Sequence, residues 1–302
     1  MEPILRKSLS AVKAGHEGLL AGFGLERFIE YGSPVGRGQR QWQERLTIRG
    51  TGAAAFENVR PITDGSGDEV GLYRGQVSRE ELAEVIDLVD AVGLLDEAPY
   101  RIEPADMSIR VTIIVGGMEV VKFIGVNEPE RLDKLHPLFQ KLQDIELGLR
   151  KYPVRVMAVA MAAPDAATVG MQRMPVTLRF TNRGTESYWM QHPRALGRGA
   201  YYDRCTLNYG YRPPRQAGIT PLPIEVMEAP LRPDMEAGMQ MIWMPAGGAQ
   251  ECQLTADVHF QREGEHLLRA VFSNYSGEAT VGGVPRMRGC VFSAEKSIPV
   301  SG

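Results

Sequence analysis

Strand-forming segments that recur through the second half of the chain constrain its fold more than any other feature. From Lys151 onward, apolar and β-branched residues gather in short runs separated by turn residues, and no helical periodicity is sustained. The runs are 154–161, 175–181, 187–191, 204–209, 223–227, 239–243, 253–260, 266–272 and 291–299. Many short strands with regular turns are typical of a β-sandwich. We therefore predict an all-β domain over residues 151–302.

Three segments of this half resemble a generic bacterial immunoglobulin-like (Ig-like) domain. PVTLRFTNRGTESYWM, residues 175–190, is similar to the early strands of such a domain. GEHLLRAVF, residues 264–272, resembles the entry to a late strand, with His266 where tyrosine is usual. FSAEKSIPV, residues 292–300, resembles the closing strand. The resemblance implies an Ig-like β-sandwich and no particular ligand.

The first half of the chain shows hairpin patterns that alternate with helical ones, and no family resemblance is identified for it. Residues 41–48 alternate in polarity, and Gly50-Thr51-Gly52 forms a turn to a partner strand at 54–59. A second hairpin is predicted at 109–115 and 120–126, because Gly116-Gly117 suits a tight turn. Residues 3–31 have a weak apolar face interrupted by glycine, which indicates one or two short helices.

Two clearer helices follow these hairpins. Ser78 and Glu81 form a capping-box pattern ahead of apolar residues at helical spacing. The second helical pattern covers about 132–149, and because Pro137 lies inside it, the helix is expected either to kink there or to start near it. The order ββαββα predicts an α+β domain over residues 1–150, in which helices cover one face of an antiparallel sheet.

Length and charge set the class of protein. A chain of 302 residues exceeds the usual size of a single core, so two domains are expected. The net charge is −3, with −6 in residues 1–150 and +3 in residues 151–302. A nucleic-acid-binding domain is usually strongly basic, so this balance argues against nucleic acid as the partner.

The sequence also indicates a location in the cell. No run approaches the ~20 apolar residues that a membrane helix needs, so no membrane insertion is expected. Because no signal-peptide core follows the basic N-terminal residues, the predicted location is cytoplasmic. It would be periplasmic or secreted if a signal peptide had been removed.

No motif for catalysis, a cofactor or a metal is identified. No CxxC pair is formed by Cys205, Cys252 and Cys290, which suit buried apolar positions. A disulfide between two of them remains an alternative if the protein is exported. His259 and His266 could face each other across a hairpin and hold a metal, but no third ligand is evident. We therefore predict no catalytic residue, no metal site and no cofactor.

One stretch, Tyr188–Arg215, is unusually rich in aromatic and cationic residues. It holds five of the ten tyrosines and five arginines with a single acid, Asp203. Tyrosine, tryptophan and arginine dominate the hot spots of protein interfaces. The predicted partner-binding residues are Tyr188, Trp189, Arg194, Arg198, Tyr201, Tyr202, Arg204, Tyr209, Tyr211 and Arg212. The alternatives are ordinary strand residues, or base-stacking aromatics in a nucleic-acid site, which the absence of lysine disfavours.

A neighbouring segment is rich in methionine. Alternation along 239–243 places Met239, Met241 and Trp243 on one face of a strand and Gln240 and Ile242 on the other. We expect the methionine-rich face to lie in the core.

These patterns favour binding over catalysis. The predicted function is a non-catalytic protein-binding or scaffold protein, of bacterial type, whose partner is another protein. One alternative is a hydrolase-type enzyme with a site at the domain junction, because such junctions favour pockets. Another is an inhibitor or regulator of a partner enzyme, which inserts a loop of the sandwich into its target.

Overall fold

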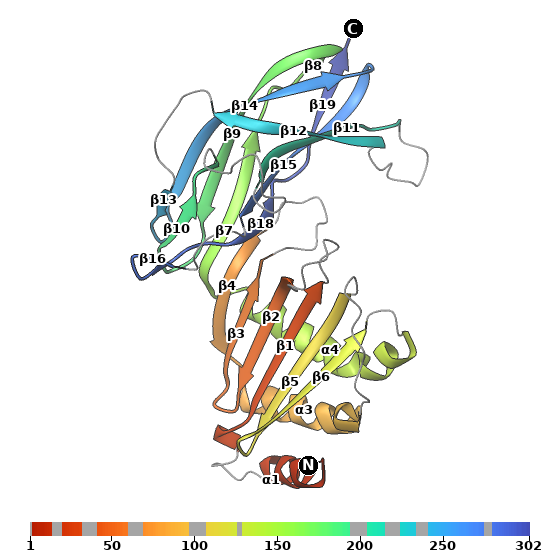
Figure 1. Ribbon diagram of the computed structural model, residues 1–302, viewed down its shortest axis with the longest axis vertical. Helices are drawn as coiled ribbons and strands as arrows, with labels where there is room; N and C mark the ends of the chain where they lie inside the picture. Colours follow the sequence, from red (N-terminus) through yellow and green to blue (C-terminus); the bar gives the residue numbers. More distant parts are fainter. Residues whose placement is uncertain are drawn as a thin grey trace. The chain divides into compact units, whose positions relative to one another are not determined.

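The structure is a computed structural model, and it describes residues 2–13, 20–31, 41–59, 69–96, 107–125, 129–193, 204–214, 224–233, 241–274 and 280–302 (Figure 1). Strands account for 59% of the structure and helices for 21%. Two compact units are present: Met1–Asn58 with Leu72–Pro153, and Val59–Gly71 with Val154–Gly302. The predicted domains 1–150 and 151–302 stay a prediction, because compactness does not show that either part folds alone.

The first unit contains a sheet with the hydrogen-bonded order β6-β5-β1-β2-β3-β4. Its strands are β1 (Gly24–Tyr31), β2 (Gln41–Arg49), β3 (Ala53–Asn58), β4 (Glu69–Gln76), β5 (Met107–Val115) and β6 (Met118–Gly125). Its helices are α1 (Glu2–Lys13), α3 (Arg79–Ala91) and α4 (Pro129–Leu149), with a short 3-10 turn, η1, at Leu94–Asp96. Helices α3 and α4 lie together on one face of this sheet (Figure 1).

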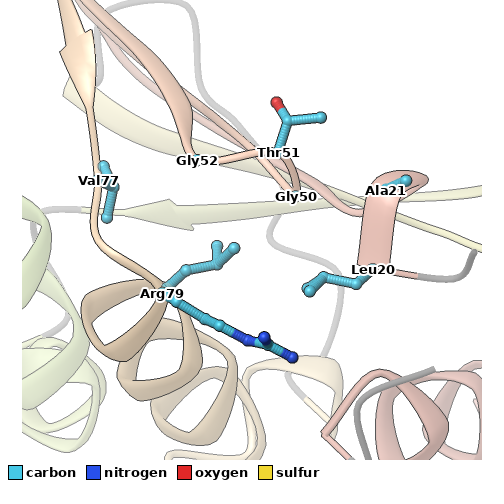
Figure 2. Close-up of a pocket in the computed structure, with 8 residues that line it drawn as sticks. Leu20, Ala21, Gly50, Thr51, Gly52, Val77 and Arg79 are labelled. Atoms are coloured by element: carbon cyan, nitrogen blue, oxygen red, sulfur yellow. The ribbon is translucent and has the colours of Figure 1, made fainter. Parts of the chain in front are cut away.

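Several local predictions for this unit are confirmed. Strands β2 and β3 pair around the Gly50-Thr51-Gly52 turn, which borders a pocket (Figure 2). Strands β5 and β6 pair around Gly116-Gly117, where both glycines have positive φ. The Ser78 hydroxyl accepts a hydrogen bond from the Glu81 amide, and the Glu81 carboxylate accepts one from the Ser78 amide. Helix α4 continues through Pro137.

The second unit is a β-structure of two packed layers. One layer pairs β7 (Pro153–Ala162), β9 (Gly170–Asn182) and β14 (Ala249–Phe260). The other pairs β11 (Arg204–Tyr211), β15 (Gly264–Asn274), β18 (Gly289–Phe292), β19 (Lys296–Ser301) and β8 (Ala167–Thr168). Strand β12 (Ile224–Pro233) joins the layers, because residues 224–230 pair with β11 and residues 231–233 with β14.

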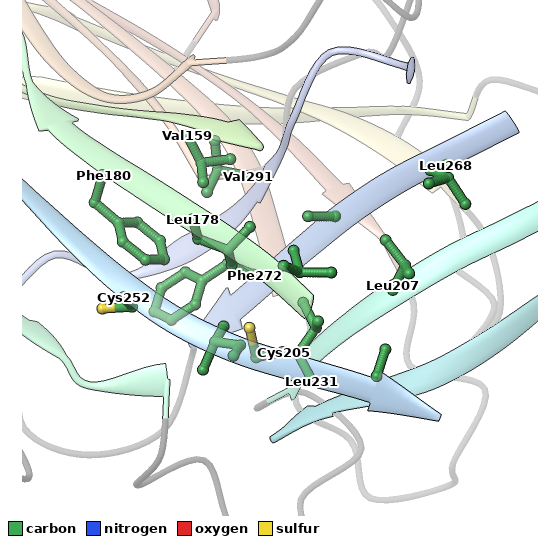
Figure 3. Close-up of a cluster of buried hydrophobic side chains, with 14 of the residues drawn as sticks. Val159, Leu178, Phe180, Cys205, Leu207, Leu231, Cys252, Leu268, Phe272 and Val291 are labelled. Atoms are coloured by element: carbon green, nitrogen blue, oxygen red, sulfur yellow. The ribbon is translucent and has the colours of Figure 1, made fainter. Parts of the chain in front are cut away.

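The core of this unit lies between the two layers (Figure 3). Phe180 of β9 meets Phe272 of β15 edge to face, with ring centroids 4.9 Å apart. Tyr209 of β11 meets Phe260 of β14 in the same way at 5.6 Å. The alternate burial along β9 and β14 places every second side chain in this core, as strand geometry requires.

The predicted fold class, an α+β domain followed by a separate Ig-like sandwich, is wrong. The hydrogen-bonded strand order runs β6-β5-β1-β2-β3-β4-β7-β9-β14-β12-β11-β15-β19-β8, with β18 beside β15, and so makes one mixed 15-stranded sheet. Three strands of this order, β1, β4 and β8, were not predicted. Residues of β1 were expected to be helical, and no strand was predicted over β4 or β8.

Tertiary structure explains the errors at β1 and β4. Strand β1 pairs with β2 on one side and β5 on the other, and these partners override its weak helical pattern. In β4, Gly71 has φ of 147°, and a Cβ there would lie 1.9 Å from the Arg155 carbonyl oxygen. Only glycine fits here, because the backbone of β7 approaches too closely for a Cβ. Glycine is unfavourable in strands, so its presence weakened the strand signal in the sequence.

None of the described helices is long and apolar enough to cross a membrane.

Candidate protein-contact surface

Two of the tyrosines predicted to bind a partner belong to the core. Tyr188 is fully buried, and its hydroxyl has no hydrogen-bond partner among the described residues. Burial raises the pKa of this phenol above its ordinary value. Tyr209 is 6% exposed, and its hydroxyl accepts a hydrogen bond of 3.2 Å from the backbone amide of His259. Neither ring is available to a partner in this structure.

The described arginines of the stretch are held by neighbouring acids. Arg204 makes two hydrogen bonds, of 2.8 and 2.9 Å, to the carboxylate of Glu228 on β12. Arg212 lies 4.0 Å from Glu265 and 3.6 Å from Glu295. These pairs satisfy the charges locally, which is the usual arrangement on the solvated side of a sheet.

The Tyr211 ring is packed from two sides. The Arg262 guanidinium lies 4.9 Å from its centroid, and the His266 ring meets it edge to face at 5.6 Å. The remaining predicted contacts, Arg194, Arg198, Tyr201 and Tyr202, lie outside the described residues. The partner-binding role of the whole set therefore stays a prediction.

Trp189 belongs to a different environment, a two-stranded ribbon at the surface of the second unit. Strand β10 (Tyr188–Gln191) pairs with β13 (Met241–Met244), so that Trp189 lies opposite Trp243. The two indole rings meet edge to face with centroids 5.0 Å apart. Trp243 is 43% exposed, whereas its neighbours Ile242 and Met244 are buried. The ribbon thus presents both tryptophans on its outer face.

This outer face is held in place by polar contacts. The carbonyl of Trp189 accepts a hydrogen bond of 2.7 Å from the Met287 amide. The Arg286 guanidinium donates to the side-chain oxygens of Gln191 and Asn274, the latter at 2.9 Å. Strand alternation places Gln191 and Met241 on the same face as the tryptophans. We call Trp189, Gln191, Met241, Trp243 and Arg286 the tryptophan surface.

Sequence reasoning found Trp189 and missed the other members of this surface. The alternation of Met241 and Trp243 opposite Ile242 was predicted, but the wrong face was assigned to the core. Period-two alternation defines two faces without showing which of them is covered. Arg286 carried no signal, because only tertiary structure brings it to β10, where it forms an isolated parallel bridge with Trp189.

The cysteines lie in apolar surroundings. None of the three forms a disulfide with another described residue, and all three are buried. Burial raises the pKa of the Cys205 thiol, and the nearby Cys252 adds to this effect. The Cys252 sulfur lies 4.0 Å from Nε2 of His192. A thiol in such surroundings is a poor nucleophile, because the thiolate is disfavoured.

A hairpin that pairs His259 with His266, the possible metal site considered from the sequence, does not occur in the part of the chain that the structure describes. Strand β14, with His259, pairs with β9 and β12, whereas β15, with His266, pairs with β11, β18 and β19. The two histidines therefore lie in different layers, and His266 is 3% exposed. Burial lowers the pKa of His266. Within the described ranges no group of three potential metal ligands occurs.

Comparison with models of known protein families and with curated proteins found no match to this chain.

Proposed function

We propose that the protein is a non-catalytic binding protein that contacts another protein through the tryptophan surface. The observation that carries this proposal is the exposure of Trp243, 43%, on a ribbon whose other face is buried. Tryptophan is the residue most enriched among interface hot spots, and leaving it exposed to water forgoes a large gain from burial.

Preorganisation supports the same function. Trp189 and Trp243 pack edge to face, and backbone pairing fixes both residues on adjacent strands. Little side-chain freedom would therefore be lost when a partner binds, which favours affinity. The partner is a protein that presents an apolar side chain to the indole of Trp243 and polar groups to Gln191 and Arg286 at its edge.

The test is affinity purification of the protein at native level from its own cells, with quantitative mass spectrometry. Trp243→Ala is expected to reduce recovery of the specific partner by at least about thirtyfold if the residue is a hot spot. Trp243→Phe keeps an aromatic ring and is expected to retain part of the binding.

Two matched variants locate the site. Met171→Ala removes an apolar side chain that is 69% exposed elsewhere on the second unit, and recovery should be unchanged. Arg204→Ala removes a charge that Glu228 already neutralises, and it should have little effect. Equal recovery with Trp243→Ala and with the wild type, at equal melting temperature, would show that the tryptophan surface does not bind the partner.

A further inference from the structure

The first unit contains a pocket of about 300 Å³ at the end of its sheet where β2 turns into β3 (Figure 2). Three elements enclose it: the helical residues at 20–21, the turn between β2 and β3, and the start of α3. The residues that line it are Leu20, Ala21, Gly50, Thr51, Gly52, Val77, Arg79 and Leu82. Its volume lies at the small end of the range for small-molecule sites.

Backbone makes up one wall of this pocket. A Cβ at Gly50 would lie 1.5 Å from the carbonyl oxygen of Leu20, and one at Gly52 would lie 2.8 Å from that of Val77. Gly52 also has φ of 84°, which strains any other residue. Three hydrogen bonds of 2.8 Å, Gly50 to Phe23, Gly52 to Arg49 and Val77 to Gly52, hold this wall. The pocket is therefore preformed.

The lining combines an apolar floor with one cation. Leu20, Val77 and Leu82 supply aliphatic side chains, the last two of them buried. Figure 2 shows the Arg79 side chain reaching from the start of α3 toward the part of the pocket near Leu20. Arg79 is exposed, and its side chain makes no hydrogen bond or ion pair with any residue that the structure describes.

Two backbone amides at the start of α3 are already occupied. The capping box of α3 uses the amides of Ser78 and Glu81, so the helix start does not supply them to a ligand. The Thr51 hydroxyl accepts a hydrogen bond of 3.4 Å from the Ala53 amide, which leaves its proton to donate. Figure 2 shows the Thr51 side chain pointing away from Arg79, so Arg79 is the group that selects a ligand by charge.

We propose that this pocket binds a small monocarboxylate with a short aliphatic chain. The carboxylate pairs with the Arg79 guanidinium, and the chain packs on Leu20, Val77 and Leu82. A guanidinium suits this role because its planar fork matches a carboxylate in two-point geometry. The site is separate from the tryptophan surface and does not depend on a protein partner.

The experiment titrates the full-length, isotope-labelled protein with sodium hexanoate at pH 7 and follows backbone amides by NMR. Saturable shifts at Gly50, Gly52 and Val77 are expected. Arg79→Gln should weaken the apparent Kd roughly tenfold or more, since it removes a charge-assisted hydrogen bond. Binding of 1-hexanol, which lacks the charge, should be weak and equal in both proteins.

Arg288→Gln is the matched control, because it removes an exposed arginine from the second unit and should leave the hexanoate Kd unchanged. Arg79→Lys keeps the charge without the fork and should give an intermediate Kd. The proposal is overturned by the absence of saturation up to about 10 mM hexanoate. Shifts confined to other amides, or an unchanged Kd in Arg79→Gln, would also overturn it.

Discussion

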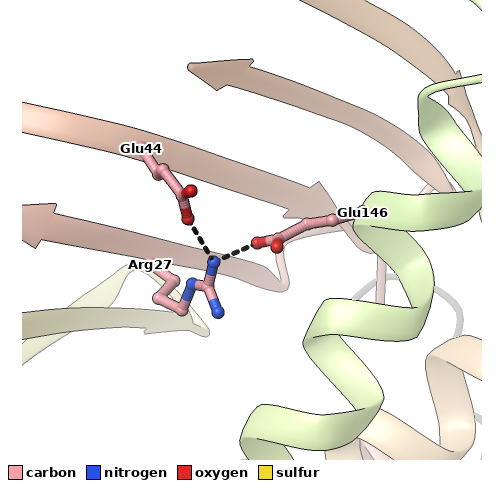
Figure 4. A network of polar contacts seen from close by, with 3 residues as sticks. All are labelled: Arg27, Glu44 and Glu146. Atoms are coloured by element: carbon pink, nitrogen blue, oxygen red, sulfur yellow. Dashed lines mark hydrogen bonds and ion pairs between the residues drawn. The ribbon is translucent and has the colours of Figure 1, made fainter. Parts of the chain in front are cut away.

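Replacing Glu146 with glutamine is expected to remove a pH dependence from the stability of the first unit. Glu146, on α4, is a buried carboxyl that pairs with Arg27 of β1 (Figure 4). The same guanidinium nitrogen lies 3.3 Å from Glu44 of β2. One buried cation thus faces two carboxylates, and Arg150 is the other charge that acts on Glu146.

The geometry gives both the sign and the size of the effect. Burial raises the pKa of Glu146 from 4.5 to about 7, against the opposing influence of Arg27 and with a further increase from Glu44. The folded state therefore holds this proton more tightly than the unfolded state. Its contribution to stability is complete below pH 4.5 and is lost as the pH rises through 7. At about 1.4 kcal/mol for each pH unit, the total is about 3 kcal/mol.

Glutamine keeps an oxygen that can accept from Arg27 but does not titrate. The free energy of unfolding of the wild type should fall by about 2.5 kcal/mol between pH 5 and pH 8, relative to that of Glu146→Gln. The assay is urea denaturation at several pH values, followed through the backbone-amide NMR signals of the first unit.

Asp133→Asn, an exposed acid on the same helix, is the control and should follow the wild type at every pH. If the unfolding free energies of Glu146→Gln and the wild type stay parallel from pH 5 to pH 8, the reasoning about the buried triad is wrong.

Two further predictions concern the core of the second unit. Phe180→Ala should lower the free energy of unfolding, measured by urea denaturation, by about 3–5 kcal/mol, because it opens a cavity beside Phe272. The control, Thr177→Ala on the same strand, should lower it far less. The three buried thiols should resist Ellman's reagent in the native protein and react fully in denaturant; fast reaction of even one thiol before unfolding would contradict their burial.

Local sequence signals predicted several elements correctly. The capping box at Ser78 and the glycine turns at 50–52 and 116–117 act within a few residues, so their effect can be predicted without knowledge of the fold. The same holds for α4, whose apolar residues recur at helical spacing on both sides of Pro137. Such elements depend mainly on neighbours along the chain.

The candidate site was only partly predictable. Composition drew attention to Tyr188–Arg215, yet Tyr188 and Tyr209 lie in the core and Arg204 and Arg212 pair with acids from other segments. Composition shows how many aromatic and cationic side chains a stretch has. It does not show which of them are exposed, because exposure depends on which side chains the opposite layer covers. Trp243 and Arg286 join Trp189 from outside that stretch, so no local window contained the surface.

By itself the sequence determined the predominance of strands in the second half, the capped helix α3 and both glycine-linked hairpins, because these depend on short-range periodicity and turn geometry. Only the tertiary structure decided that β1 and β4 are strands, that one hydrogen-bonded order connects 15 strands, and that Trp243 faces outward. The physical reason is that strand pairing and burial are non-local: a strand gains its hydrogen bonds and its covered face from segments distant in the chain.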